Sequence, residues 1–183
     1  MKKEFKKSAL AITVSGLLAL TLSACGEPSG VSTGESKPAA SQNETSEQKQ
    51  TAAKEDIKKS AINKDFTVNG LKVKIGEIQV QKDKILVGMT IKNDTKNKLT
   101  FYPDQGNSVV GSMQLEANMF MSEGKVSGDI QTGVEKSGVI HFTVPEGKNL
   151  DPKTVTSVQL HLGDVFNDKT FEAKPFDQTI ELK

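Results

Sequence analysis

The sequence predicts an all-β protein, an antiparallel sandwich of eight or nine strands that follows a leader and a tether. Beyond residue 65, hydrophobic residues alternate with polar or small ones in several short runs, which is the period-two pattern of strands with one buried face. Turn-forming residues separate these runs about every 8–15 residues, and no run has convincing helical periodicity. Many short strands with regular turns are typical of a sandwich.

The first strands are predicted on either side of a hairpin turn. The run 71–80 alternates but changes parity near Gly76, which indicates a bulge or bend. The run 85–91 is the clearest strand and places Val87 on its apolar face. Lys82-Asp83 lies between the two runs, so we expect a hairpin there.

The later strands are predicted from shorter alternating runs that end at Pro, Gly, Asn or Asp. Phe166–Lys169 is a candidate tight turn within this part of the chain. The predicted strands cover residues 99–102, 109–115, 139–144, 158–162 and 180–182.

Residues 25–64 have a different composition from the rest of the chain. After the cysteine, this segment contains no aromatic residue, and its large apolar residues are limited to Val31, Ile57 and Ile62. Such a segment buries too little apolar surface to offset its ordering entropy. We therefore expect a flexible, lipid-anchored tether over 25–64 and a folded domain over 65–183.

Residues 1–24 form a lipoprotein signal peptide in this interpretation. Four lysines are followed by the uncharged stretch 8–22, whose 15 residues would make roughly 22 Å of helix against a bilayer core of about 30 Å. The leader closes on Leu22, Ser23, Ala24 and Cys25, an arrangement that resembles a bacterial lipobox.

Cys25 is the sole cysteine of the chain, so its own sequence offers no disulfide partner. We expect it to carry lipid, the alternative being an unmodified thiol. Two acyl chains anchor a protein stably where one is marginal. The membrane is thus the first expected partner, and the extracytoplasmic face of the bacterial cell membrane is the expected location.

Charge argues against nucleic acid as a partner. Without residues 1–24 the chain loses four lysines and one glutamate, which leaves 20 Lys against 22 acidic residues and a net charge of −2. Every basic residue is lysine, whereas phosphate and base recognition usually relies on arginine forks.

No catalytic set of residues stands out, so we expect no enzymatic activity, no cofactor and no metal. His141 and His161 each fall on the polar face of a predicted strand. They would share a metal only on neighbouring strands, and two ligands make a poor site, so we interpret both as surface residues. Asp164, Asp168 and Asp177 lack the spacing of a calcium loop. The segment 104–107 could coordinate calcium in part, but we interpret it as a plain turn.

One apolar cluster is unusual for its methionines: Met113, Leu115, Met119, Phe120 and Met121. Its alternate members are expected to fill the sandwich core. Methionine-rich surfaces also adapt to varied partners, so exposed side chains at 119–121 would make that segment the leading interaction site.

Two stretches resemble a known family. Thr90–Thr95 ends a strong strand, and Gly133–Gly138 leads into Val139–Glu146. Together they are similar to bacterial lipoproteins with an immunoglobulin-like domain of unknown function, related in fold to a secreted immunoprotective extracellular protein family. The departures are Thr132, where members often have Pro, and a segment 109–115 without an aromatic residue. The resemblance implies an immunoglobulin-like sandwich and assigns no catalytic residues.

The sequence therefore favours a membrane-anchored, non-enzymatic module that binds a protein or envelope component outside the membrane. The alternative is a small-ligand or substrate-binding lipoprotein associated with a transporter. A closed apolar pocket would favour the alternative, and convex faces would favour the module.

Overall fold

The computed structural model describes residues 30–34 and 56–183. The second range contains eleven strands and one 3-10 turn, Pro103–Gln105. The strands are β1 (Lys58–Val68), β2 (Leu71–Val80), β3 (Lys84–Asn93), β4 (Leu99–Phe101), β5 (Asn107–Val110), β6 (Met113–Ala117), β7 (Glu123–Gly124), β8 (Gly128–Ile130), β9 (Glu135–Thr143), β10 (Ser157–Asn167) and β11 (Ala173–Glu181).

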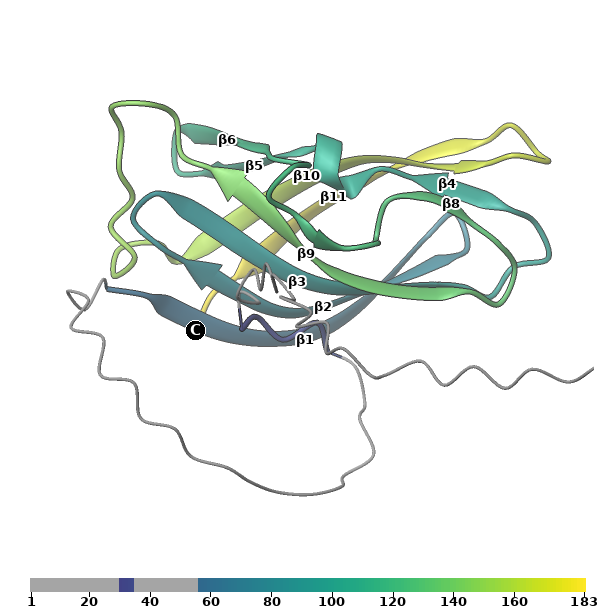
Figure 1. Cartoon of the computed structure of the whole chain (residues 1–183), viewed down its shortest axis with the longest axis horizontal. Helices are drawn as coiled ribbons and strands as arrows, with labels where there is room; N and C mark the ends of the chain where they lie inside the picture. Colours follow the sequence, from purple (N-terminus) through teal and green to yellow (C-terminus); the bar gives the residue numbers. More distant parts are fainter. Residues whose placement is uncertain (1–29, 35–55) are drawn as a thin grey trace, which may run out of the picture.

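The strands form two layers, as Figure 1 shows. One layer has the order β1-β2-β3-β9, and the other holds β6, β5, β10, β4 and β8, with β11 on the far edge of β10. All pairings are antiparallel. Strand β9 pairs with β3 along its whole length but with β6 only at Thr143 and Phe142, where the sheet passes from one layer to the other. The predicted antiparallel sandwich is confirmed.

The strand count exceeds the predicted eight or nine in part because the predicted run 109–115 is two strands, β5 and β6. The short strands β7 and β8 also add to it, since a strand of two or three residues cannot display an alternating pattern.

The core lies between the layers and is filled from both. Phe176 of β11 contacts Phe66 of β1 edge-on, with ring centroids 5.5 Å apart, and Phe101 of β4 at 6.2 Å. Val87 is fully buried, and its cross-strand partners are Ile78 and Ile140. Aromatic and branched side chains from both layers thus form one continuous core.

The predicted hairpin and bulge are both present. Gln81 donates its main-chain N–H to the Lys84 carbonyl at 2.9 Å, which closes the turn between β2 and β3. The β2–β3 register shifts between Ile75 and Glu77. Because one residue is added at Gly76, Ile75 and Ile78 both face the core despite their odd spacing.

The expected domain boundary at residue 65 is wrong, because β1 begins at Lys58. Lys58–Ala61 pair with β2 beyond a bulge, and the Ser60 hydroxyl donates to the Lys183 carbonyl at 3.0 Å. In residues 58–64 Ile62 is the one large apolar side chain packed against the core, so this part of the edge strand is held mainly by main-chain pairing with β2. Its polar composition therefore resembles that of a tether.

The described residues also include Gly30–Gly34, which lies on the outer face of β2 and β3 (Figure 1). The signal peptide, Leu22–Cys25 and residues 35–55 of the expected tether lie outside the described ranges. Within those ranges, no helix has the length and apolar character needed to cross a membrane.

Candidate functional site

The loop between β6 and β7 carries the most exposed apolar side chains of the methionine cluster. Leu115 is buried and Met113 packs against the core, as expected of core-filling residues. Phe120, by contrast, is 94% exposed, and Met119 and Met121 are each 49% exposed. The core-filling interpretation is thus confirmed for Leu115 and Met113. It is wrong for Met119, Phe120 and Met121, because β6 ends at Ala117 and these three residues lie in the loop that follows.

Asn118 shapes this loop and ties it to β9. Its side-chain oxygen accepts the main-chain N–H groups of Phe120 and Met121 at 3.1 and 3.2 Å. Its own N–H donates to the His141 carbonyl at 2.7 Å, and the His141 N–H donates to the Ser122 hydroxyl at 3.1 Å. The loop is therefore anchored at both ends.

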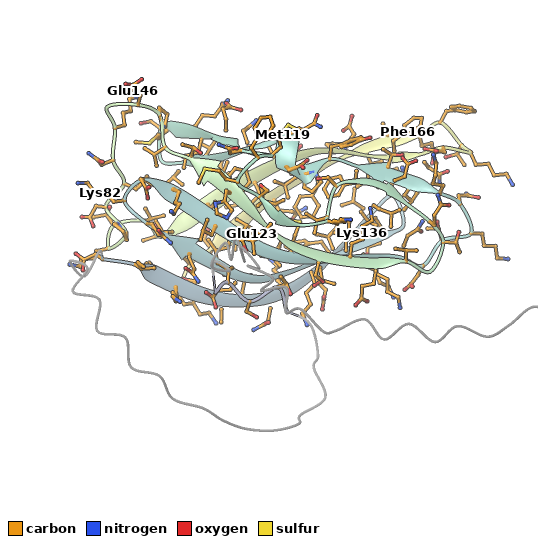
Figure 2. The ribbon with its side chains drawn as sticks, in the orientation of Figure 1. Lys82, Met119, Glu123, Lys136, Glu146 and Phe166 are labelled. Atoms are coloured by element: carbon orange, nitrogen blue, oxygen red, sulfur yellow. The ribbon has the colours of Figure 1, made fainter. Side chains whose placement is uncertain are left out.

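A recess of about 240 Å³ lies beside this loop. It is lined in part by Met119, Glu123, Lys136, Asp104 and Ser127, the first three of which are labelled in Figure 2. One carboxylate oxygen of Asp104 and the Ser127 hydroxyl are buried beside it and accept or donate no hydrogen bond within the described part of the protein. The recess therefore combines an apolar side chain, Met119, with polar groups of Asp104, Ser127 and Lys136.

The Lys136 ammonium forms one wall of the recess. It donates to the main-chain carbonyls of Ser127 and Asp129 at 3.1 and 2.8 Å. An exposed apolar tip thus adjoins a small polar recess with a fixed cation. This combination suits docking of a partner that has an apolar patch bordered by hydrogen-bonding groups.

Sequence reasoning identified the 119–121 segment but missed the recess. Asn118, two residues before Phe120, was an available signal for the turn that exposes this segment, because Asn side chains often form local turns. It gave no signal for the recess, which it does not line. Asp104 comes from the 3-10 turn and Ser127 from the loop after β7. No spacing rule links positions so far apart in the chain.

The two histidines do not meet. Strands β9 and β10 are separated by β6 and β5. His161 is partly exposed and lies 2.8 Å from Asp177 through its Nδ1. Among the residues of known placement, no group of three His, Cys, Asp or Glu side chains is arranged to hold a metal.

The surface interpretation is wrong for His141, which is only 7% exposed. It points to the outer face of β9, as its parity predicted, but β7 runs beside β9 and brings Glu123 to 3.5 Å from His141 Nε2. Burial lowers the pKa of His141 below its ordinary value near 6.5, and Glu123 opposes that shift only in part.

This lowered pKa predicts acid sensitivity. An unfolded His141 takes up a proton near pH 6.5, whereas the folded protein resists protonation until a lower pH, so stability falls as the pH drops through this interval. The slope from one such group is at most about 1.4 kcal/mol per pH unit. We expect His141→Gln to flatten the pH dependence of the unfolding free energy between about pH 7.5 and 5.5. Urea titrations of both proteins check this, and equal slopes would contradict it.

The C-terminal aspartates serve separate contacts. Asp168 and Asp129 both bind the Lys98 ammonium, at 2.6 and 2.8 Å, and these hydrogen bonds raise the pKa of Lys98. Asp177 pairs with His161, and Asp164 is exposed on β10. These three aspartates are therefore not gathered into one site.

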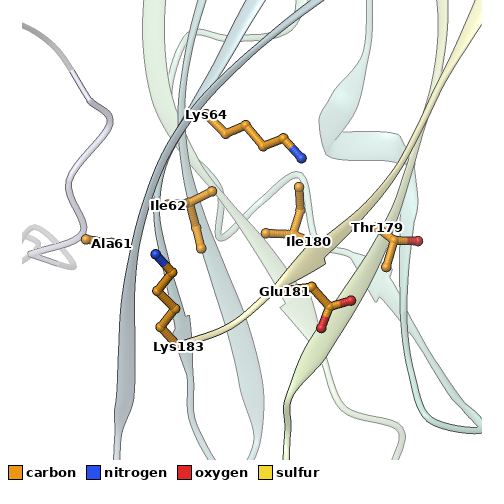
Figure 3. A pocket seen from close by; sticks show the side chains of 7 residues that line it. All are labelled: Ala61, Ile62, Lys64, Thr179, Ile180, Glu181 and Lys183. Carbon is orange, nitrogen blue, oxygen red and sulfur yellow. The ribbon is translucent and has the colours of Figure 1, made fainter.

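Other depressions among the described residues are open to solvent. The one in Figure 3 has a volume of about 200 Å³ and lies between β1 and β11, where Ile62 and Ile180 point toward one another. A larger one of about 480 Å³ adjoins the segment 149–157 and has no aromatic lining. Ligand pockets are typically 300–1,000 Å³ and rich in apolar and aromatic side chains, so neither resembles a small-molecule site.

Comparison with known proteins bears on the fold. No family model matches the sequence, and no curated protein matches it. A functionally unknown protein from Listeria monocytogenes EGD-e has a similar crystal structure, with a TM-score of 0.51 and 14% sequence identity. The match covers 71% of this chain and 89% of that one. At this identity the likeness extends to the all-β fold, and the function rests on the chain's own residues.

Proposed function

We propose that this protein is a lipoprotein held by Cys25 on the extracytoplasmic face of a bacterial cell membrane, where it binds a protein or envelope component without catalysis. The lipobox-like residues Leu22–Cys25 support the anchor. The observation that carries the binding role is the exposure of Phe120, at 94%, on a loop fixed by hydrogen bonds at both ends.

Phe120 has the physical properties of an interface anchor. A phenyl side chain that moves from water into a partner's pocket contributes about 1.5–3 kcal/mol, which corresponds to roughly 10- to 100-fold in affinity. The loop is already ordered by Asn118, so binding would lose less conformational entropy there than on a mobile loop. The flanking methionines add flexible apolar contact area.

The alternative role, ligand delivery to a transporter, has weaker support. Small-molecule sites enclose most of their ligand between apolar and aromatic walls. The recess beside Met119 is small, open and partly polar. We therefore favour recognition of a macromolecular surface.

The proposal predicts that Phe120→Ser reduces partner capture from native membranes by about 10-fold or more. Phe171→Ser is the matched control, because Phe171 is also highly exposed, at 78%, but lies in the turn between β10 and β11. Tagged wild type and both variants would be compared by quantitative pull-down after their melting curves are shown to agree.

A double variant, His141→Ala with His161→Ala, completes that experiment. Full capture by folded Phe120→Ser would remove the loop from the proposed interface. Loss of capture in the histidine variant alone, together with zinc bound by wild type and absent from that variant, would assign binding to a metal site instead.

A further inference from the structure

The segment Gly30–Gly34 crosses the outer face of β2 and β3 (Figure 1). The strand residues beneath it include Gly76 on β2 and Gly88 on β3. Together these two glycines leave a shallow furrow on a face that would otherwise carry side chains.

The two glycines are needed for space and not for backbone conformation, since neither has a positive φ. A methyl group at Gly88 would overlap the Ser32 carbonyl oxygen and lie 2.9 Å from Val31 Cγ1. A methyl group at Gly76 would lie 2.5 Å from both the Gly34 nitrogen and the Ser32 oxygen. Glycine inside a strand weakens it and often marks the close approach of another backbone.

Polar side chains of the same face bind the main chain of the segment. The Gln79 side-chain amide donates to the Gly30 carbonyl at 3.3 Å, and the Thr90 hydroxyl donates to the Thr33 carbonyl at 3.1 Å. Gln79 and Thr90 are almost fully buried although they point away from the core. Their buried polar atoms are satisfied in part by this segment.

We propose that the Gly76–Gly88 furrow is a docking site for an extended, small-residue peptide, and that its occupant is this chain's own Gly30–Gly34. The furrow binds two main-chain carbonyl groups of the segment. Because the two backbones lie in close contact, no large side chain fits between them. Docking of the segment limits how far the domain can lie from Cys25.

The length of the chain between Cys25 and the docked segment limits the distance from Cys25 to the domain. Cys25 precedes Gly30 by five residues, which span at most roughly 17 Å, whereas the 33 residues from Cys25 to Lys58 could span up to roughly 110 Å. The docked segment therefore holds the domain near Cys25 rather than at the end of a long tether. Whether the domain also lies close to a membrane depends on the proposed lipid anchor. The docking of the segment does not depend on that anchor.

Docking also sets the orientation of the candidate interface. Segment 30–34 lies along the layer that contains β2 and β3 (Figure 1), whereas Met119 lies toward the other layer (Figure 2). With the furrow turned toward the anchor, the Met119–Met121 loop faces away from it.

The test places a nitroxide label on Cys25, the sole cysteine, in the full-length unlipidated chain in mild detergent, and reads amide line broadening by NMR. Among the amides of the strands, we expect strong broadening in wild type around Gly88 on β2 and β3; amides next to Cys25 in sequence broaden in every variant and are not counted. Gly88→Val should abolish it while the domain keeps its amide dispersion and melting temperature. Thr90→Val should weaken it, and Thr90→Ser, which keeps the hydroxyl donor, should preserve it.

Each outcome of this experiment either supports or contradicts docking of the segment. Broadening that persists in folded Gly88→Val, or broadening absent from wild type, overturns the docking site. If Gly88→Val fails to fold, the threonine pair decides, and equal broadening in Thr90→Val and Thr90→Ser overturns it. Because the chain carries no lipid, failure here is distinguishable from failure of the membrane-anchor proposal, which cell fractionation tests.

Discussion

Val87→Asp should cost several kcal/mol of unfolding free energy, enough to abolish cooperative folding if the wild-type domain has ordinary stability. Val87 is fully buried on β3 and lies between Ile78 of β2 and Ile140 of β9. A carboxylate there has no charged or hydrogen-bonding partner among these neighbours. It must either remain protonated at a raised pKa or draw water into the core, and both outcomes destabilise the folded state.

The matched control is Lys92→Asp on the same strand. Lys92 lies on the opposite parity, its side chain is 43% exposed, and its contact with Asp94 is a solvent-exposed ion pair. Loss of such a pair costs at most about 1 kcal/mol. Denaturant titrations of the two variants check the difference, and equal losses would show that the inner and outer faces of β3 are misassigned.

Cys25→Ala should convert the protein from a membrane-bound form to a released or mislocalised one. The single thiol of the chain is the sole acceptor available for a thioether-linked lipid. Each buried methylene of an acyl chain contributes about 0.8 kcal/mol, so loss of two chains removes essentially all of the anchoring energy. Fractionation of cells with metabolic labelling by a palmitate analogue measures both retention and lipid.

Ser29→Ala is a suitable control for that experiment, because it lies four residues beyond the cysteine and outside Leu22–Cys25. It should keep both membrane retention and label. Unchanged retention with equal labelling of Cys25→Ala would contradict the lipoprotein proposal and leave Cys25 as an ordinary thiol.

The strands with a strong inside–outside contrast could be predicted from sequence. In β3 the hydrophobic residues from Ile85 to Ile91 recur at every second position, and this alternation specified the strand and the face that it turns to the core. The opposite face of β3 is also largely buried, which the alternation did not predict. The bulge at Gly76 was likewise detectable, because a change of parity has few other causes within one strand.

The candidate site was less predictable. The apolar pattern could not separate Leu115, which is buried, from Phe120, which is exposed. Where β6 ends is set by its pairing with β5 and β9 and by the contacts of Asn118 with β9. These are long-range contacts, and a local window of sequence does not contain them.

The sequence by itself determined the all-β class, the antiparallel hairpin of β2 and β3, and which face of β3 points into the core, because these follow from local alternation and turn chemistry. Only the tertiary structure decided that polar residues 58–64 form an edge strand, that His141 is covered by β7, and that Gly76 and Gly88 lie beneath Gly30–Gly34. Each of these features depends on a partner distant in sequence. Main-chain pairing is nearly independent of side-chain identity, and a strand glycine permits a close approach without indicating which segment makes it, so the local sequence does not identify the distant partner.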